Sequence, residues 1–295
     1  MDHQAEVCRV LDEVKPTHVI NCAGKTGRPN VDWCEDHKLE TIESNVTGTL
    51  ILVKACHDRN IHVTVMATGC KLYPPLTLQE MLLTVFSGIY TSTYDHSNPS
   101  GSELTSKAFT EDSPANFSGS FYSYGKSRVE DLIRLYPNCL VLRLRMPVSD
   151  DLHSRSFVTK ITKYDKVVNV PNSHSILTNL LPVVVALAEH KEEGVLNFTN
   201  PGAISHNEVL TLYKEIVDPA FTWKNFGLEE QSHVIKADRS NCELDSSKLL
   251  SKVKQYGGEG YDSEVPEIHE AYRQCFERMK AGMQLHPGAD QVRVH

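Results

Sequence analysis

The chain has 295 residues, of which 40% are hydrophobic and 23% charged, and its formal net charge at pH 7 is −8. This is an ordinary globular composition, with room for one large domain or for a domain and a smaller lobe. An acidic chain without a basic block is a poor candidate for a nucleic-acid partner. The longest apolar-looking stretch, residues 76–90, is too short to span a bilayer, so we expect no membrane partner.

The eight cysteines contain no C-x-x-C pair, and the N-terminus (MDHQAEVCRV) is polar. We therefore expect no metal site and no signal peptide. Reduced thiols are typical of the cytosol, so we expect a cytoplasmic protein.

Helices alternate with apolar strands along the first half of the chain. We predict helices at 4–14, 36–58 and 122–135, each followed by a strand, at 18–23, 61–67 and 140–144. This alternation predicts an α/β fold with βαβ units and a Rossmann-like, doubly wound parallel sheet, occupying residues 1–150.

The second half has longer polar loops. Helices are predicted at 177–190, 206–217, 245–254 and 265–284, with strands at 195–198 and 233–237. We interpret residues 151–285 as a smaller mixed substrate-binding lobe, interleaved with the sheet and folded over its carboxyl edge. Residues 286–295 are interpreted as a loose tail.

Tyr122 and Lys126 are spaced to share one face of the third predicted helix. An ammonium beside a phenol lowers the pKa of the phenol, which can then exchange a proton with a carbonyl oxygen during hydride transfer. The Y-x-x-x-K pattern alone also fits a surface pair. Tyr124 is a weaker candidate, because Arg128 stands where its lysine would be.

Other polar residues fall at predicted strand ends. Asn21, Ala23 and Gly24 close the first strand and Thr68 closes the second, where open parallel sheets bind ligands. The Gly24-Lys25-Thr26 run is not a phosphate loop, because the glycine that this motif needs five residues earlier is replaced by Val19.

These motifs, in this order, resemble the extended short-chain dehydrogenases. The likeness is narrower at residues 26–35 (TGRPNVDWCE), 67–70 (ATGC), 119–123 (GSFYS), 142–147 (LRLRMP), 197–202 (NFTNPG) and 221–225 (FTWKN). There the chain resembles the bifunctional 3,5-epimerase/4-reductases that make UDP- or dTDP-rhamnose, over about residues 1–70 and 97–280.

The resemblance implies an NADPH- or NADH-dependent enzyme acting on a nucleotide-linked 4-keto-6-deoxyglucose. Cys70 and Lys160 would be the acid and base of epimerisation. Tyr122 would protonate the C4 oxygen, Lys126 would tune Tyr122, and Thr68 would hydrogen-bond the same oxygen. From the residues alone, Cys70 could equally be a core residue and Lys160 a solvated helix charge.

The implied ligand contacts are spread along the chain. Those to the cofactor are Asn21, Ala23, Gly24, Asn45, Tyr122, Lys126, Met146 and Pro147. Those to the nucleotide sugar are Arg28, Asn30, Asn172, Asn200 and Arg239, each of which could instead be a surface or capping residue. A homodimer is also possible.

Two departures from the family pattern stand out. No glycine precedes Gly24, so the glycine-rich turn of the family is missing, and we expect an N-terminal truncation that leaves apolar groups at an edge of the sheet. Residues 71–96 form an atypical insertion directly after Cys70, interpreted either as a lid or as translated intron.

Three functions remain open at this stage. One is the epimerase/reductase, and the second is a related 4-reductase or 4,6-dehydratase. Gly69-Cys70 stands where dehydratases usually carry an Asp-Glu pair, which argues against a dehydratase. The third is a catalytically impaired homologue, which the missing glycine turn favours.

Overall fold

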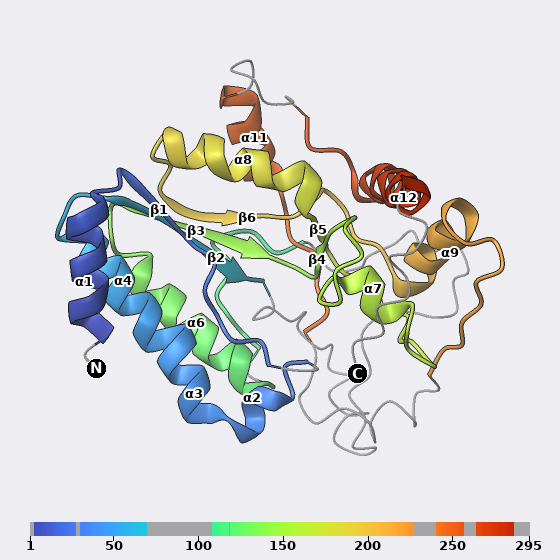
Figure 1. Ribbon diagram of the computed structural model, residues 1–295, viewed down its shortest axis with the longest axis horizontal. Coiled ribbons are helices and arrows are strands. Elements are labelled where there is room, and N and C mark those ends of the chain that lie inside the picture. The colour runs from blue at the N-terminus through green and yellow to red at the C-terminus, as the bar shows by residue number, and fades with distance from the viewer. Residues whose placement is uncertain are drawn as a thin grey trace.

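A parallel four-stranded sheet forms the centre of the molecule (Figure 1). The computed structural model describes residues 3–27, 30–69, 108–117, 119–226, 240–256 and 264–285. Within them, strands β1 (His18–Asn21), β2 (His62–Thr68), β3 (Cys139–Leu144) and β6 (Gly194–Asn197) pair in the order β1-β2-β3-β6, every pair parallel. The predicted α/β class with a parallel sheet is confirmed.

Helices cover both faces of this sheet (Figure 1). On one face lie α1 (His3–Val14), α4 (Gly48–His57) and α6 (Phe121–Ile133); on the other lie α8 (Leu177–Glu189) and α11 (Ser247–Tyr256). Strand β3 divides its side chains accordingly, because successive residues of a strand point to opposite faces. Cys139 and Val141 belong to a first apolar cluster, formed with α1, α4 and α6, whereas Leu140 and Leu142 belong to a second, formed with α8 and α11.

The helix predicted at 36–58 is observed as one continuous helical run from Lys38 to His57, made of α3 (Lys38–Ile42), a π-helical segment at Glu43–Thr47 and α4. A short separate helix, α2 (Trp33–Asp36), precedes it. Apolar periodicity continues through the run, so it could not reveal the π turn. A π turn widens the helix by one residue and is frequent at functional sites.

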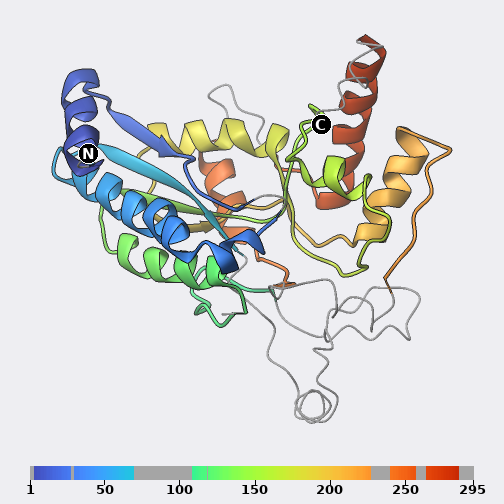
Figure 2. The ribbon, with the colours of Figure 1, turned by 60° about the horizontal axis from the view of Figure 1, so that its bottom comes forward.

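A third apolar cluster lies beyond the carboxyl ends of the strands (Figure 2). It is formed around β4 (Pro147–Val148), α7 (Phe157–Ile161), β5 (Ser175–Ile176), α9 (His206–Ile216) and α12 (Ile268–Leu285). Strands β4 and β5 form a separate parallel pair. These two strands and α7 were not predicted, because they are too short to carry a periodic pattern. The strand predicted at 233–237 and the insertion at 71–96 lie outside the described residues.

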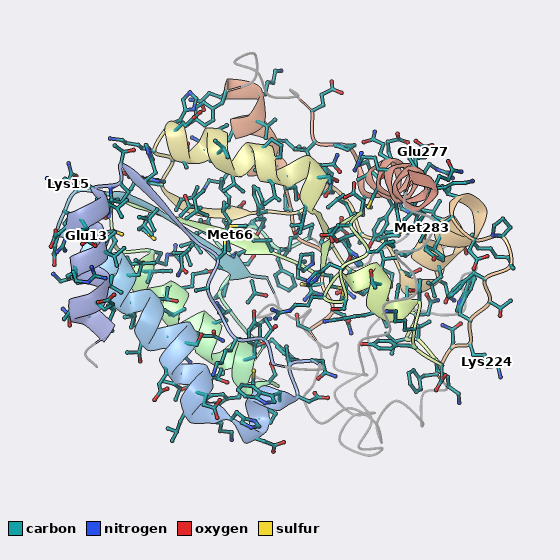
Figure 3. The ribbon with its side chains drawn as sticks, viewed as in Figure 1. Glu13, Lys15, Met66, Lys224, Glu277 and Met283 are labelled. Atoms are coloured by element: carbon teal, nitrogen blue, oxygen red, sulfur yellow. The ribbon has the colours of Figure 1, made fainter. Side chains whose placement is uncertain are left out.

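Strand β1 is an edge of the described sheet. Ile20 is 42% exposed there. In Figure 3 the partly buried Met66 of β2 lies near the centre of the view, whereas the charged Glu13, Lys15, Lys224 and Glu277 lie around its rim. No helix in the described part of the chain is long and apolar enough to cross a membrane.

Candidate active site

The candidate site lies where the parallel strands end. Gly24 follows β1, Thr68 is the last residue of β2, and Met146 follows β3. Because parallel strands run in the same direction, these three positions share one edge of the sheet. The structure therefore brings together residues that are more than 120 positions apart in the chain.

Gly24 and Lys126 approach each other closely. A Cβ built on Gly24 would stand 3.5 Å from the Lys126 Nζ and 3.3 Å from the Asn45 Oδ1. A side chain here would crowd the Asn45 Oδ1 and lie in van der Waals contact with the Lys126 Nζ, so glycine keeps the space beside the ammonium open. Gly24, Asn45 and Lys126, which the sequence predicts to bind the cofactor, thus lie next to one another.

Asn45 holds the loop that follows β1. Its Oδ1 accepts a 2.6 Å hydrogen bond from the Lys25 backbone N–H, and its Nδ2 donates a 2.7 Å bond to the Lys25 carbonyl. Asn21 acts at the same loop, since its Oδ1 accepts from the Ala23 backbone N–H at 3.0 Å. These bonds satisfy the loop's backbone groups and position Gly24.

Tyr122 and Lys126 lie on the first turns of α6 and are only 9% and 7% exposed. The alternative of a surface pair is therefore wrong for this Y-x-x-x-K motif. Burial lowers the pKa of Lys126. Tyr124, the weaker candidate, is 46% exposed and lies under the guanidinium of Arg128, so it faces away from this site.

Two contacts fix the start of α6. The Ser120 Oγ accepts a 3.2 Å hydrogen bond from the Ser123 N–H, which caps the helix. The Glu35 Oε1 accepts a 2.7 Å bond from the Phe121 N–H, 86 residues away in sequence. In the sequence, Glu35 is only the last residue of the family-like segment 26–35. The structure identifies it as a residue that orients the helix bearing Tyr122.

The end of β2 packs against β3. Thr68 is buried, and a Cβ on Gly69 would meet Arg145 Cγ at 3.1 Å and Leu244 Cδ1 at 2.6 Å. Arg145 is almost fully buried, and its guanidinium donates to the Ser240 carbonyl at 2.8 Å and to Asn172 Oδ1. Sequence reasoning missed Arg145, whose surroundings come from three distant segments. Cys70 lies outside the described residues.

The chain turns sharply after β3. Met146 has φ +36°, an uncommon backbone conformation for a residue with a side chain. Pro147 follows and is exposed, and Val148 is buried in the third apolar cluster. Strain of this kind tends to persist where function requires it.

Lys160 lies on α7, in the group of elements beyond the sheet edge. It is half-buried, and burial, followed by the charge of Arg155, lowers its pKa. It is therefore not the fully solvated charge that the alternative interpretation requires. A lowered pKa makes a lysine a better base near neutral pH.

Of the five predicted sugar contacts, the structure describes Asn30, Asn172 and Asn200. Asn172 and Asn200 are fully buried and bonded inside the protein: Asn172 to Arg145 and the Cys242 N–H, Asn200 to the Ile176 N–H and the Pro266 carbonyl. This geometry supports a role in holding loops. Asn30 is half-buried, and its Oδ1 accepts from the Asp32 N–H at 2.8 Å. Arg28 and Arg239 lie outside the described residues.

Comparison with known proteins agrees with this geometry. The sequence profile of the NAD dependent epimerase/dehydratase family matches residues 1–117. A bifunctional dTDP-4-dehydrorhamnose 3,5-epimerase/dTDP-4-dehydrorhamnose reductase from Arabidopsis thaliana is 48% identical over 246 residues, covering 83% of this chain and 74% of that protein. The chain belongs to the NAD-dependent epimerase/dehydratase family.

Other members of this epimerase/dehydratase family are similar over different spans. The crystal structure of a UDP-rhamnose synthase from Acanthamoeba polyphaga mimivirus has a TM-score of 0.77 and 33% identity, covering 93% of this chain and 86% of that one. A trifunctional UDP-glucose 4,6-dehydratase/UDP-4-keto-6-deoxy-D-glucose 3,5-epimerase/UDP-4-keto-L-rhamnose-reductase from Arabidopsis thaliana is 46% identical over 256 residues, 86% of this chain but 35% of that protein. The resemblance stated from sequence is confirmed.

The fold extends to more distant enzymes. A dTDP-4-dehydrorhamnose reductase from Bacillus anthracis str. Ames, in complex with NADP, has a TM-score of 0.66 at 15% identity and covers 94% of this chain and 85% of that one. At this identity the likeness concerns the fold alone. It is a Rossmann-type reductase fold, as expected.

Proposed function

We propose that the chain is a nucleotide-sugar 3,5-epimerase/4-reductase. It converts UDP- or dTDP-4-keto-6-deoxyglucose to the corresponding rhamnose nucleotide with NADPH or NADH as reductant. The observation that carries this proposal is the close grouping of the exposed Gly24 with the buried Asn45 and Lys126 at the strand ends, with Tyr122 one turn away on α6. The rhamnose-forming relatives supply the substrate class.

The reduction of the C4 ketone uses Tyr122, Lys126 and Thr68. As the C4 ketone becomes an alcohol, its oxygen needs a proton, which Tyr122 donates. Lys126 favours the phenolate that remains, because a neighbouring ammonium stabilises negative charge on the phenol oxygen. Thr68, buried at the end of β2, donates a hydrogen bond to the same oxygen.

The epimerising half belongs to Lys160 and Cys70. The C4 ketone acidifies the hydrogens on C3 and C5, so a base on one face of the ring and an acid on the other invert each centre. Lys160 removes the proton, which its lowered pKa favours. Cys70 is assigned the acid role by resemblance only, since it is not among the described residues.

The described residues fit the nicotinamide end of the cofactor. Gly24 leaves a space beside the Lys126 ammonium that a Cβ would fill, and this space suits a ribose hydroxyl. Met146 and Pro147 follow β3 at the same edge and would line the nicotinamide ring. The chemistry that bound NAD(P)H supplies is a hydride for C4.

A cofactor titration and a product assay test the proposal together. NADPH is titrated while its fluorescence is followed, and UDP-4-keto-6-deoxyglucose is then incubated with enzyme and NADPH and the product sugar identified by NMR. We expect binding and a UDP-rhamnose product. A product epimerised at neither carbon would favour the single-function 4-reductase, and no binding would favour an impaired homologue.

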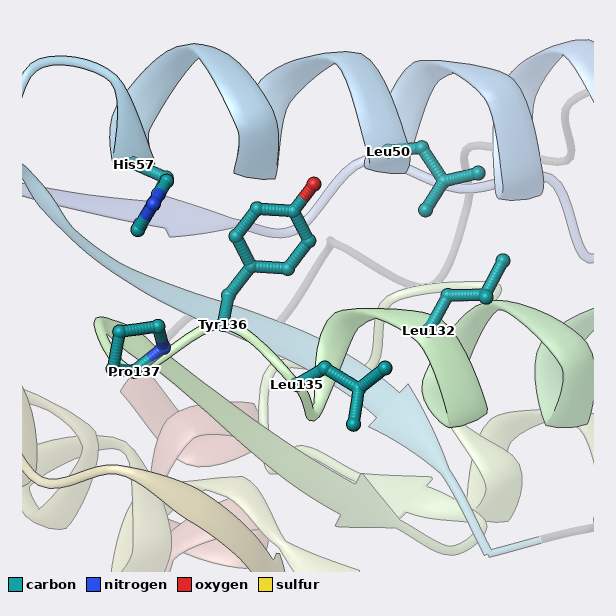
Figure 4. Close-up of a pocket in the computed structure, with 6 residues that line it drawn as sticks. All are labelled: Leu50, His57, Leu132, Leu135, Tyr136 and Pro137. Atoms are coloured by element: carbon teal, nitrogen blue, oxygen red, sulfur yellow. The ribbon is translucent and has the colours of Figure 1, made fainter.

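We further propose a homodimer through α6. Tyr124, Arg128, Asp131, Leu132 and Leu135 form one exposed stripe, and Leu132 and Leu135 line an apolar groove of about 450 Å³ with Leu50, His57, Tyr136 and Pro137 (Figure 4). In the proposed dimer, the two copies pair antiparallel along α6, and the twofold axis passes between residues 129 and 130. Arg128 of one subunit therefore faces the partner subunit's Asp131. Tyr124 then faces the partner subunit's Leu135, so the stripe is self-complementary.

Light scattering after size exclusion measures the mass directly. We expect Leu135→Glu to halve it, because a charge would be buried in the interface. Val185→Glu, on the exposed side of α8 across the sheet, is the matched control. A monomeric wild type would overturn the dimer.

We also propose a cytoplasmic location, in keeping with the seven described cysteines, all of which are free thiols.

A further inference from the structure

The loop at residues 149–156 joins β4 to α7, and hydrogen bonds between its first and last residues close it. The Ser156 Oγ accepts a 3.2 Å hydrogen bond from the Ser149 N–H and donates a 3.3 Å bond to the Ser149 carbonyl. Inside the loop, Asp151 Oδ1 accepts from the Ser149 hydroxyl at 2.6 Å and from the His153 N–H at 3.0 Å. Such a network leaves the loop few alternative conformations.

Two arginines tie this loop to its surroundings. Arg278 of α12 donates through Nε to Asp150 Oδ2 at 2.8 Å, which anchors the loop to the third apolar cluster. Arg155, at the other end, donates through Nη2 to Thr26 Oγ1 at 3.2 Å across 129 positions of sequence. The loop therefore connects the elements beyond the sheet with the segment that follows β1.

Thr26 lies close in sequence to residues of the candidate cofactor site. Thr26 comes two residues after Gly24, which lies against Lys126, and directly after Lys25, whose backbone Asn45 holds. Arg155 comes two residues before α7, which carries Lys160. One hydrogen bond thus links the segment beside the reducing residues with the helix of the epimerising base.

The charges around Lys160 point to the same arginine. Strand β4, which packs on α7, contains only Pro147 and Val148 and has no titratable group. In the adjoining loop, Asp150 is paired with Arg278 and Asp151 accepts the two bonds described above.

The buried histidines beneath α7 carry no charge near neutral pH. His174 and His206 contact the Phe157 ring, and burial lowers the pKa of both, that of His206 to about 4. Among the described residues, the guanidinium of Arg155 is thus the charge that acts on the amine of Lys160.

We propose that Arg155 is a positioning residue for Lys160: by bonding to Thr26 it joins the segment after β1 to the start of α7, the helix that carries the lysine. This inference rests on the proposed function for the identity of Lys160 as the base. It adds a second role of Arg155, namely that its positive charge disfavours protonation of the lysine.

The test separates the two halves of the reaction. In D₂O without nicotinamide, the rate of deuterium uptake at C3 and C5 of UDP-4-keto-6-deoxyglucose reports epimerisation. Oxidation of NADPH by the already epimerised 4-keto sugar reports reduction. We expect Arg155→Gln and Thr26→Val to slow deuterium uptake about tenfold and to leave reduction within twofold. Thr26→Ser, which keeps the hydroxyl, should behave as wild type.

The pH profile separates charge from geometry. Arg155→Gln removes the neighbouring charge, so the pKa of Lys160 rises and deuterium uptake moves to higher pH; Arg155→Lys keeps the charge and should keep the profile. Equal losses in both half-reactions, or uptake within twofold of wild type in Arg155→Gln, would overturn the proposal.

Amine labelling makes the inference independent of catalysis. The pH midpoint for modification of Lys160 by an amine-reactive reagent is read by mass spectrometry, with Lys163 in the same peptide region as internal reference. We expect the midpoint of Lys160 to rise in Arg155→Gln and to stay as in the wild type in Arg155→Lys. If the wild type takes up no deuterium but the midpoint shifts, the epimerase assignment fails while the role of Arg155 stands; an unshifted midpoint overturns that role.

Discussion

The Nζ of Lys126 lies 3.5 Å from the point where Gly24 would carry a Cβ. One residue follows the first strand and the other lies on α6, so the sheet and the helix meet at this point. The Lys126 side chain is buried, whereas Gly24 is exposed. Most of the predicted cofactor residues are arranged around this contact.

Gly24 is the first position to vary. Gly24→Ala places a methyl group 3.3 Å from Asn45 Oδ1, a tight contact, and Gly24→Val adds two more carbons toward Lys126. We expect the alanine to weaken NADPH binding by a few-fold and the valine by about tenfold or more, equivalent to about 1.4 kcal/mol. Fluorescence titration measures this. Equal affinity of Gly24→Val and wild type would contradict a cofactor site here.

Tyr122→Phe removes the proton donor of the reductive half. The phenyl ring keeps the packing of a 9% exposed side chain, so the fold should be unaffected. We expect NADPH oxidation to slow by about 10²- to 10⁴-fold, the usual contribution of a general acid. Deuterium uptake at C3 and C5 should persist. If Tyr124→Phe had the larger effect, the assignment to Tyr122 would be wrong.

Asn45 is expected to stabilise the loop after β1. Asn45→Ala leaves both the Lys25 N–H and its carbonyl without their bonds of 2.6 and 2.7 Å. Because Lys25 is exposed and water can reach its backbone, losing these two hydrogen bonds should cost about 1–3 kcal/mol in the free energy of unfolding. Urea denaturation measures the change. Asn45→Asp, which retains the acceptor and loses the donor, should lie between the alanine variant and wild type.

The buried ion pair between Arg143 and Glu130 joins β3 to α6. Nη2 of Arg143 lies 2.8 Å from Glu130 Oε1, and both side chains are only 2% exposed. Glu130→Ala would leave the guanidinium buried without its carboxylate, which we expect to cost about 3–5 kcal/mol. Glu13→Ala, in the exposed 2.7 Å pair with Arg9, is the control and should change stability by less than about 1 kcal/mol. Similar unfolding midpoints for the two variants would refute this.

His269 should make stability depend on pH. Partial burial lowers its pKa, but hydrogen bonds and charges of Glu267 and Glu208 outweigh burial, and the net pKa is raised above 6.5. The folded protein therefore binds this proton more tightly than the unfolded chain does. The resulting stabilisation is fully present below pH 6.5 and is lost as the pH rises through the folded pKa.

Melting curves of wild type and His269→Gln test this between pH 5.5 and 8.5. We expect the difference in melting temperature to be largest at the acid end and to shrink as the pH rises. A difference that grows with pH would mean that the histidine is neutral when folded and that its two carboxylate contacts do not hold a proton.

Local patterns were enough for the long elements. Apolar periodicity located α1, α6 and α8 to within a residue or two, because a helix of ten or more residues repeats its pattern several times. The same reasoning located the helical run from α3 to α4 within two residues of 36–58 but did not reveal its π turn, and it failed at α7, which has only five residues. The division of the chain near residue 150 stays a prediction.

By itself, the sequence determined the parallel sheet, the order of its motifs and the spacing of Tyr122 and Lys126, since these follow from short-range periodicity and from strands that end in polar residues. Only the tertiary structure decided what those residues meet. The pairing of Asn45 with Lys25 spans 20 positions, and that of Arg155 with Thr26 spans 129. Such contacts depend on how helices pack on the sheet and on which backbone groups they bury, and no local propensity carries that information.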